Sequence, residues 1–236
     1  MPIEVCICSI DPWWRGLLRE SARLIDKLCE LWKHEHENGG APYWHGERAV
    51  LGLLCAAAWR IPRGWSLMEY SARHRSNRER VRGKGDAGKG DAWIGYYRSR
   101  NQEGNWNVEC KVCWVSLDKD QEETIHGVLA KLNTAKKQLR NLSPDWRQNE
   151  GLAICFLVPS QRKDGKTDGS VAVKKMRDLF RTLKRRSAGR YALVALYRPP
   201  RDKVLIDYHS RYSPGLLFLA ERVPFHSRKA RKEKRM

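Results

Sequence analysis

The chain has 236 residues, and its 46 lysines and arginines exceed its 27 aspartates and glutamates, for a formal charge of +19. This length allows one sizeable hydrophobic core, so we expect one main domain. No uninterrupted apolar run approaches the roughly 20 residues that cross a bilayer, which excludes a transmembrane helix. The positive charge favours a polyanionic partner, of which nucleic acid is the simplest; a basic surface without a specific ligand is the alternative.

Seven cysteines are scattered along the chain, mostly within apolar runs. An odd, scattered set is not a disulfide framework, so we expect reduced thiols and a cytoplasmic protein. Cys110 and Cys113 have the spacing of half a zinc site, but no second pair follows at a suitable distance. Residues 1–8 lack the basic leader of a signal peptide, which agrees with this expectation.

Two helices are predicted in the N-terminal quarter of the chain. Residues 13–37 carry apolar side chains at helical spacing, and Gly39 and Gly40 end this amphipathic helix. Residues 47–60 are apolar nearly all round, which indicates a helix buried against a sheet. A short strand candidate follows at residues 65–72.

Residues 73–90 form a basic segment with four glycines, too charged and too flexible in composition to pack. Because this segment leads directly into Asp91, we expect a mobile loop at the mouth of a site, which closes over bound substrate without supplying metal ligands.

Two strands are predicted after this loop, at residues 91–97 and 106–117, and we expect them to pair antiparallel. Residues two apart on a strand share a face, so Glu109 and Lys111 point to the same side. The intervening residues are expected to point the other way into packing: Val108, Cys110, Val112 and Trp114. Burying two charges is costly unless they pair or bind a metal, and Asp91 on the neighbouring strand supplies a second carboxylate. This constellation predicts a metal-dependent phosphodiesterase site.

The rest of the chain alternates helices and strands, which predicts a parallel portion of the sheet. Asp118 and Gln121 resemble a capping box at the start of a helix with apolar positions between residues 125 and 139. Further elements are expected in this order: a buried strand at 151–158, a basic amphipathic helix at 171–186, a buried strand at 191–197, two short apolar runs within 204–223, and a disordered basic tail at 226–236.

This order of elements, over roughly residues 46–198, resembles the core of the PD-(D/E)XK nuclease superfamily, the restriction-endonuclease-like fold. Asp91 and the sequence Glu109-x-Lys111 match the family's metal ligands and lysine, and Glu47 lies where many members carry a first-helix glutamate. Gly90 stands where some members have proline, and Asp86 is an alternative to Asp91.

The resemblance implies an α/β fold with a mixed central sheet flanked by helices. It implies a nuclease-like domain at residues 46–225, to which an N-terminal helical extension at 1–45 and a basic tail at 226–236 are added. Asp91, Glu109 and the backbone carbonyl of Cys110 would hold Mg²⁺, with Mn²⁺ as a substitute, while Lys111 would orient the attacking water or stabilise developing charge. The implied activity is endonucleolytic hydrolysis of DNA, and DNA is preferred over RNA only because of the resemblance.

The basic segments are expected to bind phosphates of the nucleic acid. The candidate contact residues are Arg73, Arg75, Arg78, Arg80, Arg82, Lys84, Lys89, Lys174, Lys175, Arg181 and Arg185. The ten tryptophans are interpreted as core and loop anchors rather than base-stacking residues, although Trp93 and Trp106 lie near the predicted site.

Three alternatives remain open. Glu109 and Lys111 are also compatible with an ordinary salt bridge on an exposed strand, and Glu47 with a charge at a helix N-terminus. The chain is also compatible with a non-catalytic nucleic-acid-binding protein on the same fold. A structure-selective nuclease that cuts junctions as a homodimer is the third alternative.

Overall fold

The computed structural model describes residues 3–35, 46–73, 87–99, 102–142, 150–163, 169–186, 191–199, 205–206 and 211–224. The four helices in these ranges are α1 (Trp13–Glu35), α2 (Glu47–Arg60), α3 (Gln121–Arg140) and α4 (Gly169–Arg186). The nine strands are β1 (Ile3–Cys8), β2 (Gly64–Arg73), β3 (Ala87–Ser99), β4 (Gln102–Ser116), β5 (Glu150–Arg162), β6 (Leu193–Tyr197), β7 (Leu205–Ile206), β8 (Arg211–Ser213) and β9 (Leu216–Val223).

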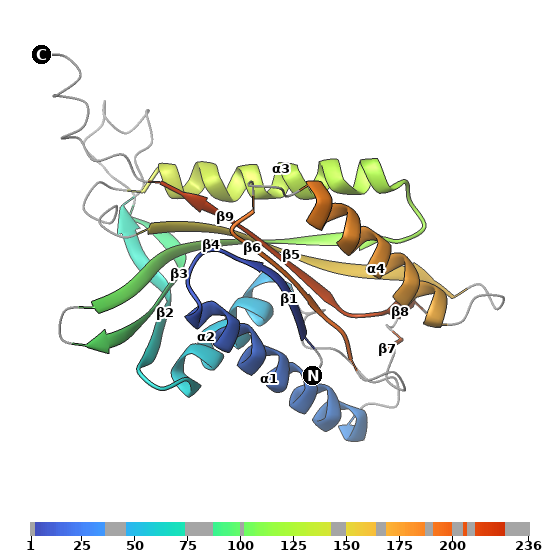
Figure 1. Cartoon of the computed structure of the whole chain (residues 1–236), viewed down its shortest axis with the longest axis horizontal. Helices are drawn as coiled ribbons and strands as arrows, with labels where there is room; N and C mark the ends of the chain where they lie inside the picture. The colour runs from blue at the N-terminus through green and yellow to red at the C-terminus, as the bar shows by residue number, and fades with distance from the viewer. Residues whose placement is uncertain are drawn as a thin grey trace, which may run out of the picture.

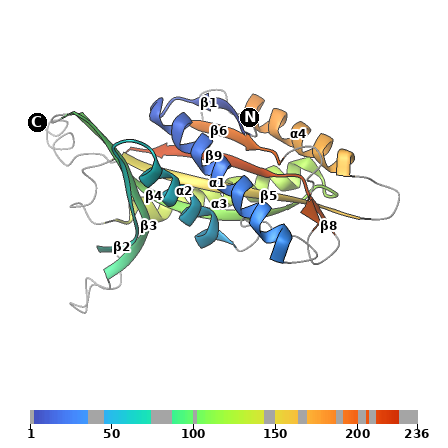
Figure 2. The same ribbon diagram turned by 90° about the horizontal axis from the view of Figure 1, so that it is seen from below.

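A mixed, curled sheet forms the centre of the molecule, with the strand order β1-β6-β9-β5-β4-β3-β2 (Figures 1 and 2). The short strand β8 pairs with the end of β5 and with β7. In the described part of the chain β4 and β5 form the one parallel pair, and α3 makes the crossover that such a pair requires. The α/β class and the antiparallel pairing of β3 with β4 are therefore confirmed.

Helices cover both faces of the sheet: α1 and α2 lie on one face, and α3 and α4 lie on the other (Figure 1). The first face packs Leu17 and Leu54 against Ile94 and Phe156. The second face packs Leu132 of α3 against Leu157 and other residues of β5 and β9. Burial of apolar side chains on both faces is the main stabilising contribution, at about 25 cal/mol per Å² removed from water.

Residues 3–35 belong to the central sheet and to its hydrophobic core. β1 pairs antiparallel with β6 at the end of the sheet. Trp14, Leu17 and Leu18 of α1 are fully buried, and they belong to the same core cluster as residues of α2, β3 and β5. The segment that was expected as a helical extension thus closes one face of the sheet.

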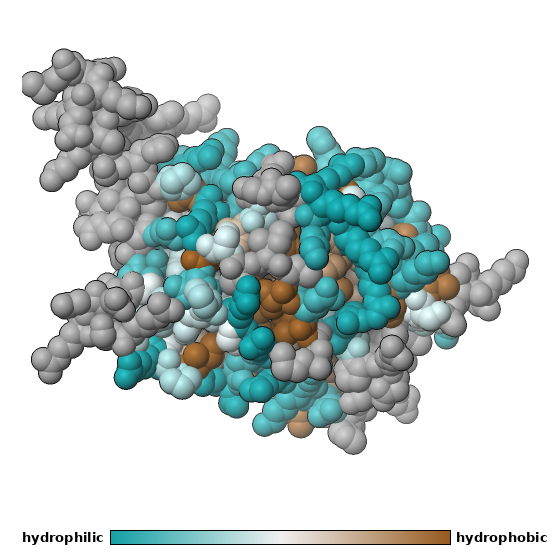
Figure 3. Space-filling model, viewed as in Figure 1, coloured by the Kyte–Doolittle hydropathy of each residue, from teal (hydrophilic) through white to brown (hydrophobic). Residues whose placement is uncertain are grey.

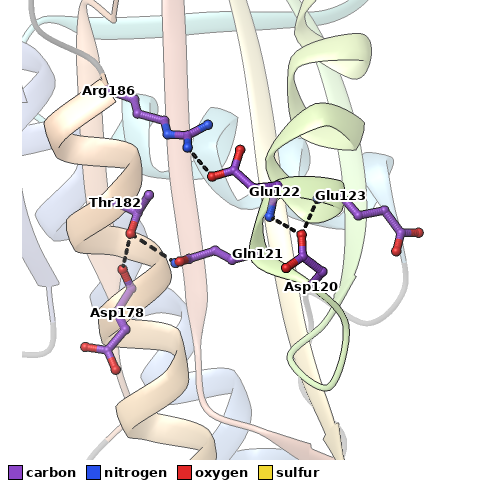
Figure 4. Close-up of polar contacts among 7 residues, drawn as sticks. All are labelled: Asp120, Gln121, Glu122, Glu123, Asp178, Thr182 and Arg186. Atoms are coloured by element: carbon purple, nitrogen blue, oxygen red, sulfur yellow. Dashed lines mark hydrogen bonds and ion pairs between the residues drawn. The ribbon is translucent and has the colours of Figure 1, made fainter.

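The N-cap of α3 lies two residues later in the chain than the capping box predicted. Asp120 is the N-cap, and its side chain accepts hydrogen bonds from the backbone N–H groups of Glu122 and Glu123 (Figure 4). Asp118 instead accepts a hydrogen bond from the backbone N–H of Arg162 at 3.0 Å. The prediction that Asp118 caps the helix was wrong, because this side chain joins the β4–α3 connection to the end of β5.

The first predicted helix begins as expected at Trp13, the second has the predicted bounds of α2, and β2 extends its strand candidate by one residue at each end. β3 begins earlier than expected, because residues 87–90 pair with residues 70–73 of β2. Assigning residues 87–90 to a loop was therefore wrong, whereas residues 74–86 of that segment lie outside the described residues, as does the tail at 226–236. None of the helices in the described ranges has the length and hydropathy needed to span a bilayer.

Candidate active site

A notch opens in the sheet where β3 and β4 separate. The two strands are paired from Ser99 and Gln102 as far as Ala92 and Val108, and in the described part of the chain no pairing between them continues past that point. Beyond it, β3 remains paired with β2, and β4 remains paired with β5. The backbone of Cys110, which would face β3 in a continuous ladder, is therefore free to interact with side chains.

Asp91 and Lys111 occupy this notch. The carboxylate of Asp91 accepts a hydrogen bond from the Cys110 N–H at 2.7 Å, in place of the missing strand partner. The ammonium group of Lys111 donates to the carbonyl oxygen of Cys110 and lies 3.6 Å from Asp91 Oδ2. These contacts bring together the two residues that the sequence predicted to share a site.

Glu109 is the most unusual charged residue of the notch. Its side chain is 1% exposed, and neither carboxylate oxygen receives a hydrogen bond from a donor among the described residues. Burial raises the pKa of Glu109 to about 9, and the neighbouring Asp91 carboxylate adds to this rise, while Lys111 opposes it. At neutral pH and without a bound cation, the structure therefore favours a protonated Glu109.

Lys111 also contacts a third carboxylate, Glu47, at the start of α2. Its Nζ lies 3.3 Å from Glu47 Oε1, although α2 packs on the face of the sheet opposite α3. Burial acts to lower the pKa of Lys111, but the carboxylates of Asp91, Glu47 and Glu109 outweigh it and raise that pKa. Lys111 is thus a charged ammonium group held among three acidic side chains.

The oxygen atoms of this notch fit a hard divalent cation. The buried Glu109 oxygens lack donors, the Asp91 carboxylate lies beside them, and the Cys110 carbonyl faces the same gap. Among the described residues, no group of three or more histidine, cysteine, aspartate or glutamate side chains is arranged to hold a metal. The candidate site therefore consists of two carboxylates and a carbonyl, and Glu47 is placed at its rim through Lys111.

Two predictions about β4 have different outcomes. Cys110 and Cys113 pack into the clusters on opposite faces of the sheet, as expected for residues three apart on a strand. Val108 and Cys110 are buried, but Trp114 is 57% exposed, so the expectation that it packs was wrong.

The predicted phosphate-binding residues fall into separate regions. Arg73 ends β2 and Lys89 lies on β3 next to the notch, so two of them are strand residues rather than loop residues. Five more lie outside the described residues: Arg75, Arg78, Arg80, Arg82 and Lys84. Lys89 is two residues from Asp91 on β3, whereas Arg73 pairs with Ala87, four residues from Asp91 and about 13 Å along the strand.

The basic helix α4 lies in the half of the molecule opposite β2 and β3 (Figures 1 and 2). Lys175 pairs with Asp118 at 3.2 Å, and Arg181 pairs with Asp178 of its own helix. Arg186, the last residue of α4, pairs with Glu122 of α3 (Figure 4). Hydrophilic residues dominate the surface over α3 and α4 (Figure 3), where the predicted contacts Lys174 and Arg185 are also exposed. Part of the positive charge of α4 is therefore neutralised within the protein.

A pocket of about 530 Å³, which the sequence did not predict, lies beside the notch on the β2–β3 hairpin. Its aromatic and polar walls include Trp59, Arg63, Trp65, Trp93, Tyr97 and Asn105. The spacing of Asp91, Trp93 and Tyr97 on one strand is a signal that could have placed these rings on the same face. Trp106, by contrast, packs in the core against Trp13, Trp14 and Tyr96.

Comparison with known proteins adds no identity: no protein-family model and no curated protein matches the chain. A function must therefore be argued from the notch, its buried carboxyl group and its surrounding charges.

Proposed function

We propose that the chain is a divalent-metal-dependent endonuclease of the PD-(D/E)XK type that hydrolyses DNA at the notch between β3 and β4. The single observation that carries the proposal is the buried Glu109, whose oxygens have no donor among the described residues although Asp91 and Lys111 adjoin them. A buried carboxyl group in this state is costly unless it is protonated or serves a cation. A bound divalent ion would supply the missing partner.

The order of elements supports the same proposal. Helix α2 precedes the antiparallel strands β2, β3 and β4, and the crossover helix α3 then leads to the parallel strand β5. This succession is what the resemblance to the restriction-endonuclease-like core implies, and it puts Asp91 and Glu109-x-Lys111 on adjacent strands. Fold likeness alone does not determine activity, so the proposal depends on the residues of the notch.

Asp91, Glu109 and the Cys110 carbonyl are the groups that would hold Mg²⁺ or, as a substitute, Mn²⁺. When bound, the ion neutralises charge on the phosphodiester and makes water a competent nucleophile at neutral pH. Lys111 stabilises the negative charge that develops on the phosphate or orients the attacking water. Glu47 keeps the Lys111 ammonium at the rim of the notch through their 3.3 Å contact. No covalent intermediate with the protein is required.

The excess positive charge supports a nucleic-acid substrate, with DNA preferred over RNA because of the resemblance. Lys89 lies two residues from Asp91 on β3, and residues 73–84 add six lysines and arginines to the sequence before it. Phosphate contacts of this kind make binding strongly dependent on salt concentration.

One observation favours a second candidate, a non-catalytic nucleic-acid-binding protein. The Lys111 ammonium already contacts Asp91, Glu47 and the Cys110 carbonyl, so it partly supplies the positive charge that a metal would bring. A protein that has lost turnover could retain the notch in this form. Measurement of metal-dependent cleavage separates the two candidates.

The test is the cleavage of supercoiled plasmid and of labelled single-stranded and duplex oligonucleotides, in Mg²⁺ and in EDTA. The wild type should cut in Mg²⁺ alone, and Asp91→Asn, Glu109→Gln and Lys111→Met should each lower the rate by at least about a hundredfold. The absence of cleavage of every substrate by folded wild type in Mg²⁺ and Mn²⁺ would favour the non-catalytic candidate.

Glu221→Gln is the matched control for Glu109→Gln. Glu221 is also a buried glutamate of the central sheet, but it lies on β9 and pairs with Lys136. This variant should retain cleavage at temperatures where it is folded. Equal losses in the two variants would show that the effect of Glu109→Gln is structural, and would contradict the proposed site.

A further inference from the structure

The pocket on the β2–β3 hairpin, named the aromatic pocket here, is built into the sheet rather than being an accidental surface hollow. Trp65 and Gly95 are directly paired across β2 and β3, and a Cβ at Gly95 would come within 2.5 Å of the Trp65 indole. The glycine therefore lets this ring lie across the neighbouring strand. Trp65 also meets Trp93 edge-on, with 4.8 Å between the ring centroids.

Two further aromatic rings present their surfaces at this pocket. Trp59 is 62% exposed and Tyr97 is 53% exposed, values unusual for side chains of this size. The Trp59 indole N–H donates to the Ser66 carbonyl at 3.1 Å, which fixes the ring against the edge of β2. Tyr97 lies 6.1 Å from Trp65, measured between ring centroids. The Trp59 ring is thus held by a hydrogen bond, and the Tyr97 ring lies within aromatic contact range of Trp65.

Polar groups accompany these rings. Arg63 and Asn105 line the same pocket, and Arg63 has a positive φ of 65°, which is uncommon for a non-glycine residue. Its carbonyl oxygen accepts a hydrogen bond from the Tyr97 N–H at 3.0 Å, so the turn before β2 is tied to β3. A guanidinium, a carboxamide and flat aromatic faces are the groups that proteins use to stack on a nucleobase and bind its edge.

We infer that the aromatic pocket binds an unstacked nucleobase of the DNA strand whose backbone lies at the notch. This inference rests on the proposed function, because it concerns how the same substrate is positioned. Trp93 is two residues from Asp91 on β3, which corresponds to about 7 Å along the strand. Tyr97, the exposed ring on the same strand, is six residues from Asp91, or about 20 Å, so a base stacked on it lies roughly six base steps of 3.4 Å from the scissile phosphate. The substrate class is DNA with an unpaired nucleotide, supplied either by a single strand or by a base turned out of a duplex.

The test is DNA binding in EDTA, followed by fluorescence anisotropy, so that it does not depend on cleavage. The probes are a mixed-sequence single strand, an abasic strand of the same length, and duplexes with and without one bulged base. Tyr97→Ala should weaken binding of the base-bearing single strand by about tenfold, since one base–aromatic stack contributes about 1–3 kcal/mol. Binding of the abasic strand should be unchanged, and Tyr97→Phe, which keeps the ring, should bind like the wild type.

Trp114→Ala is the matched control, because Trp114 is similarly exposed but does not line the pocket. It should leave the affinities for all probes unchanged.

If Tyr97→Ala weakens binding of both the single strand and the bulged duplex, the pocket accepts a base from a single strand and a base turned out of a duplex. If it weakens binding of the single strand alone, the pocket accepts a base from single-stranded DNA only. The proposal is overturned if Tyr97→Ala binds base-bearing and abasic strands with the same ratio as the wild type. It is also overturned if sedimentation shows that the variant separates a wild-type dimer, because the pocket would then contact a second copy. Absence of cleavage by the folded wild type, with base-dependent binding still present, would contradict the nuclease proposal and leave this one standing.

Discussion

Two buried glutamates flank the same residue of the central sheet, and they have opposite surroundings. Ala153 of β5 is paired with Glu109 on β4 and with Glu221 on β9, so the two side chains point to the same face of the sheet. Glu221 is 6% exposed and forms an ion pair with Lys136 of α3 at 2.6 Å. Glu109 is 1% exposed, and its oxygens receive no hydrogen bond from the described residues.

This difference indicates that Glu221 stabilises the fold, whereas Glu109 is the candidate for a chemical role. Glu221 has a cation of its own, supplied by the helix that covers that face. Lys111 opposes the raised pKa of Glu109, but its contacts are with Asp91, Glu47 and the Cys110 carbonyl. Burial without a donor lowers stability unless the group is protonated or binds a cation, and our proposal assigns Glu109 to a bound cation.

The largest effect is expected when the cation that pairs with Glu221, the ammonium group of Lys136, is removed. Lys136→Met should lower the free energy of unfolding by about 3 kcal/mol, because it removes the cation that pairs with the buried Glu221. Glu109→Gln should leave stability unchanged or raise it at neutral pH, because the neutral amide does not need the proton that a buried Glu109 must take up on folding. Urea denaturation of both variants, followed by circular dichroism, measures the contrast. A loss in Glu109→Gln as large as that in Lys136→Met would mean that both glutamates are structural.

The pH dependence of stability tests whether the buried Glu109 is protonated in the folded chain. Burial raises the pKa of Glu109 to about 9 in the folded chain from an ordinary value of 4.5, so the folded state binds the extra proton between these values. Stability from this group is therefore fully present below pH 4.5 and falls as the pH rises toward 9. The slope is at most about 1.4 kcal/mol per pH unit, and Glu109→Gln should remove it. Urea midpoints in EDTA between pH 5 and 9 give the difference between the two proteins. Parallel pH profiles for wild type and variant would show that Glu109 titrates normally.

The smallest expected effect concerns the lysine that stands among the acidic side chains of the notch. Lys111→Met should raise the affinity for Ca²⁺ or Mg²⁺ by about fivefold at pH 9, since a competing ammonium leaves Asp91 and Glu47. Calorimetric titration measures this affinity without any need for cleavage. Lys119→Met is the control, because Lys119 pairs with Glu123 on the surface. A weaker metal affinity in Lys111→Met would show that Lys111 supports the metal-binding geometry rather than competing with it.

Local patterns in the sequence were sufficient for most elements and for the nearness of three residues of the candidate site. The apolar run of residues 47–60 corresponds to the bounds of α2, and the apolar positions Ile125, Val128, Leu132, Ala135 and Leu139 are the buried face of α3. The period of two on β4 and the expected antiparallel pairing brought Asp91 next to Glu109 and Lys111. These features depend on residues close in the chain or on one hairpin, where side-chain periodicity determines which face is buried.

Tertiary structure alone decided the rest, because the decisive partners are far apart in the sequence. The last long strand, β9, inserts between β5 and β6, and it thereby brings Glu221 beside Ala153. The N-terminal strand β1 completes the sheet next to β6, and α1 closes one of its faces. Whether Glu109 has a donor, whether Trp114 is covered, and whether Trp59 and Tyr97 share a pocket depend on how distant elements pack. The sequence by itself therefore determined the elements and the identity of the candidate ligands, whereas packing determined that one buried carboxyl group was left without a hydrogen-bond donor among the described residues.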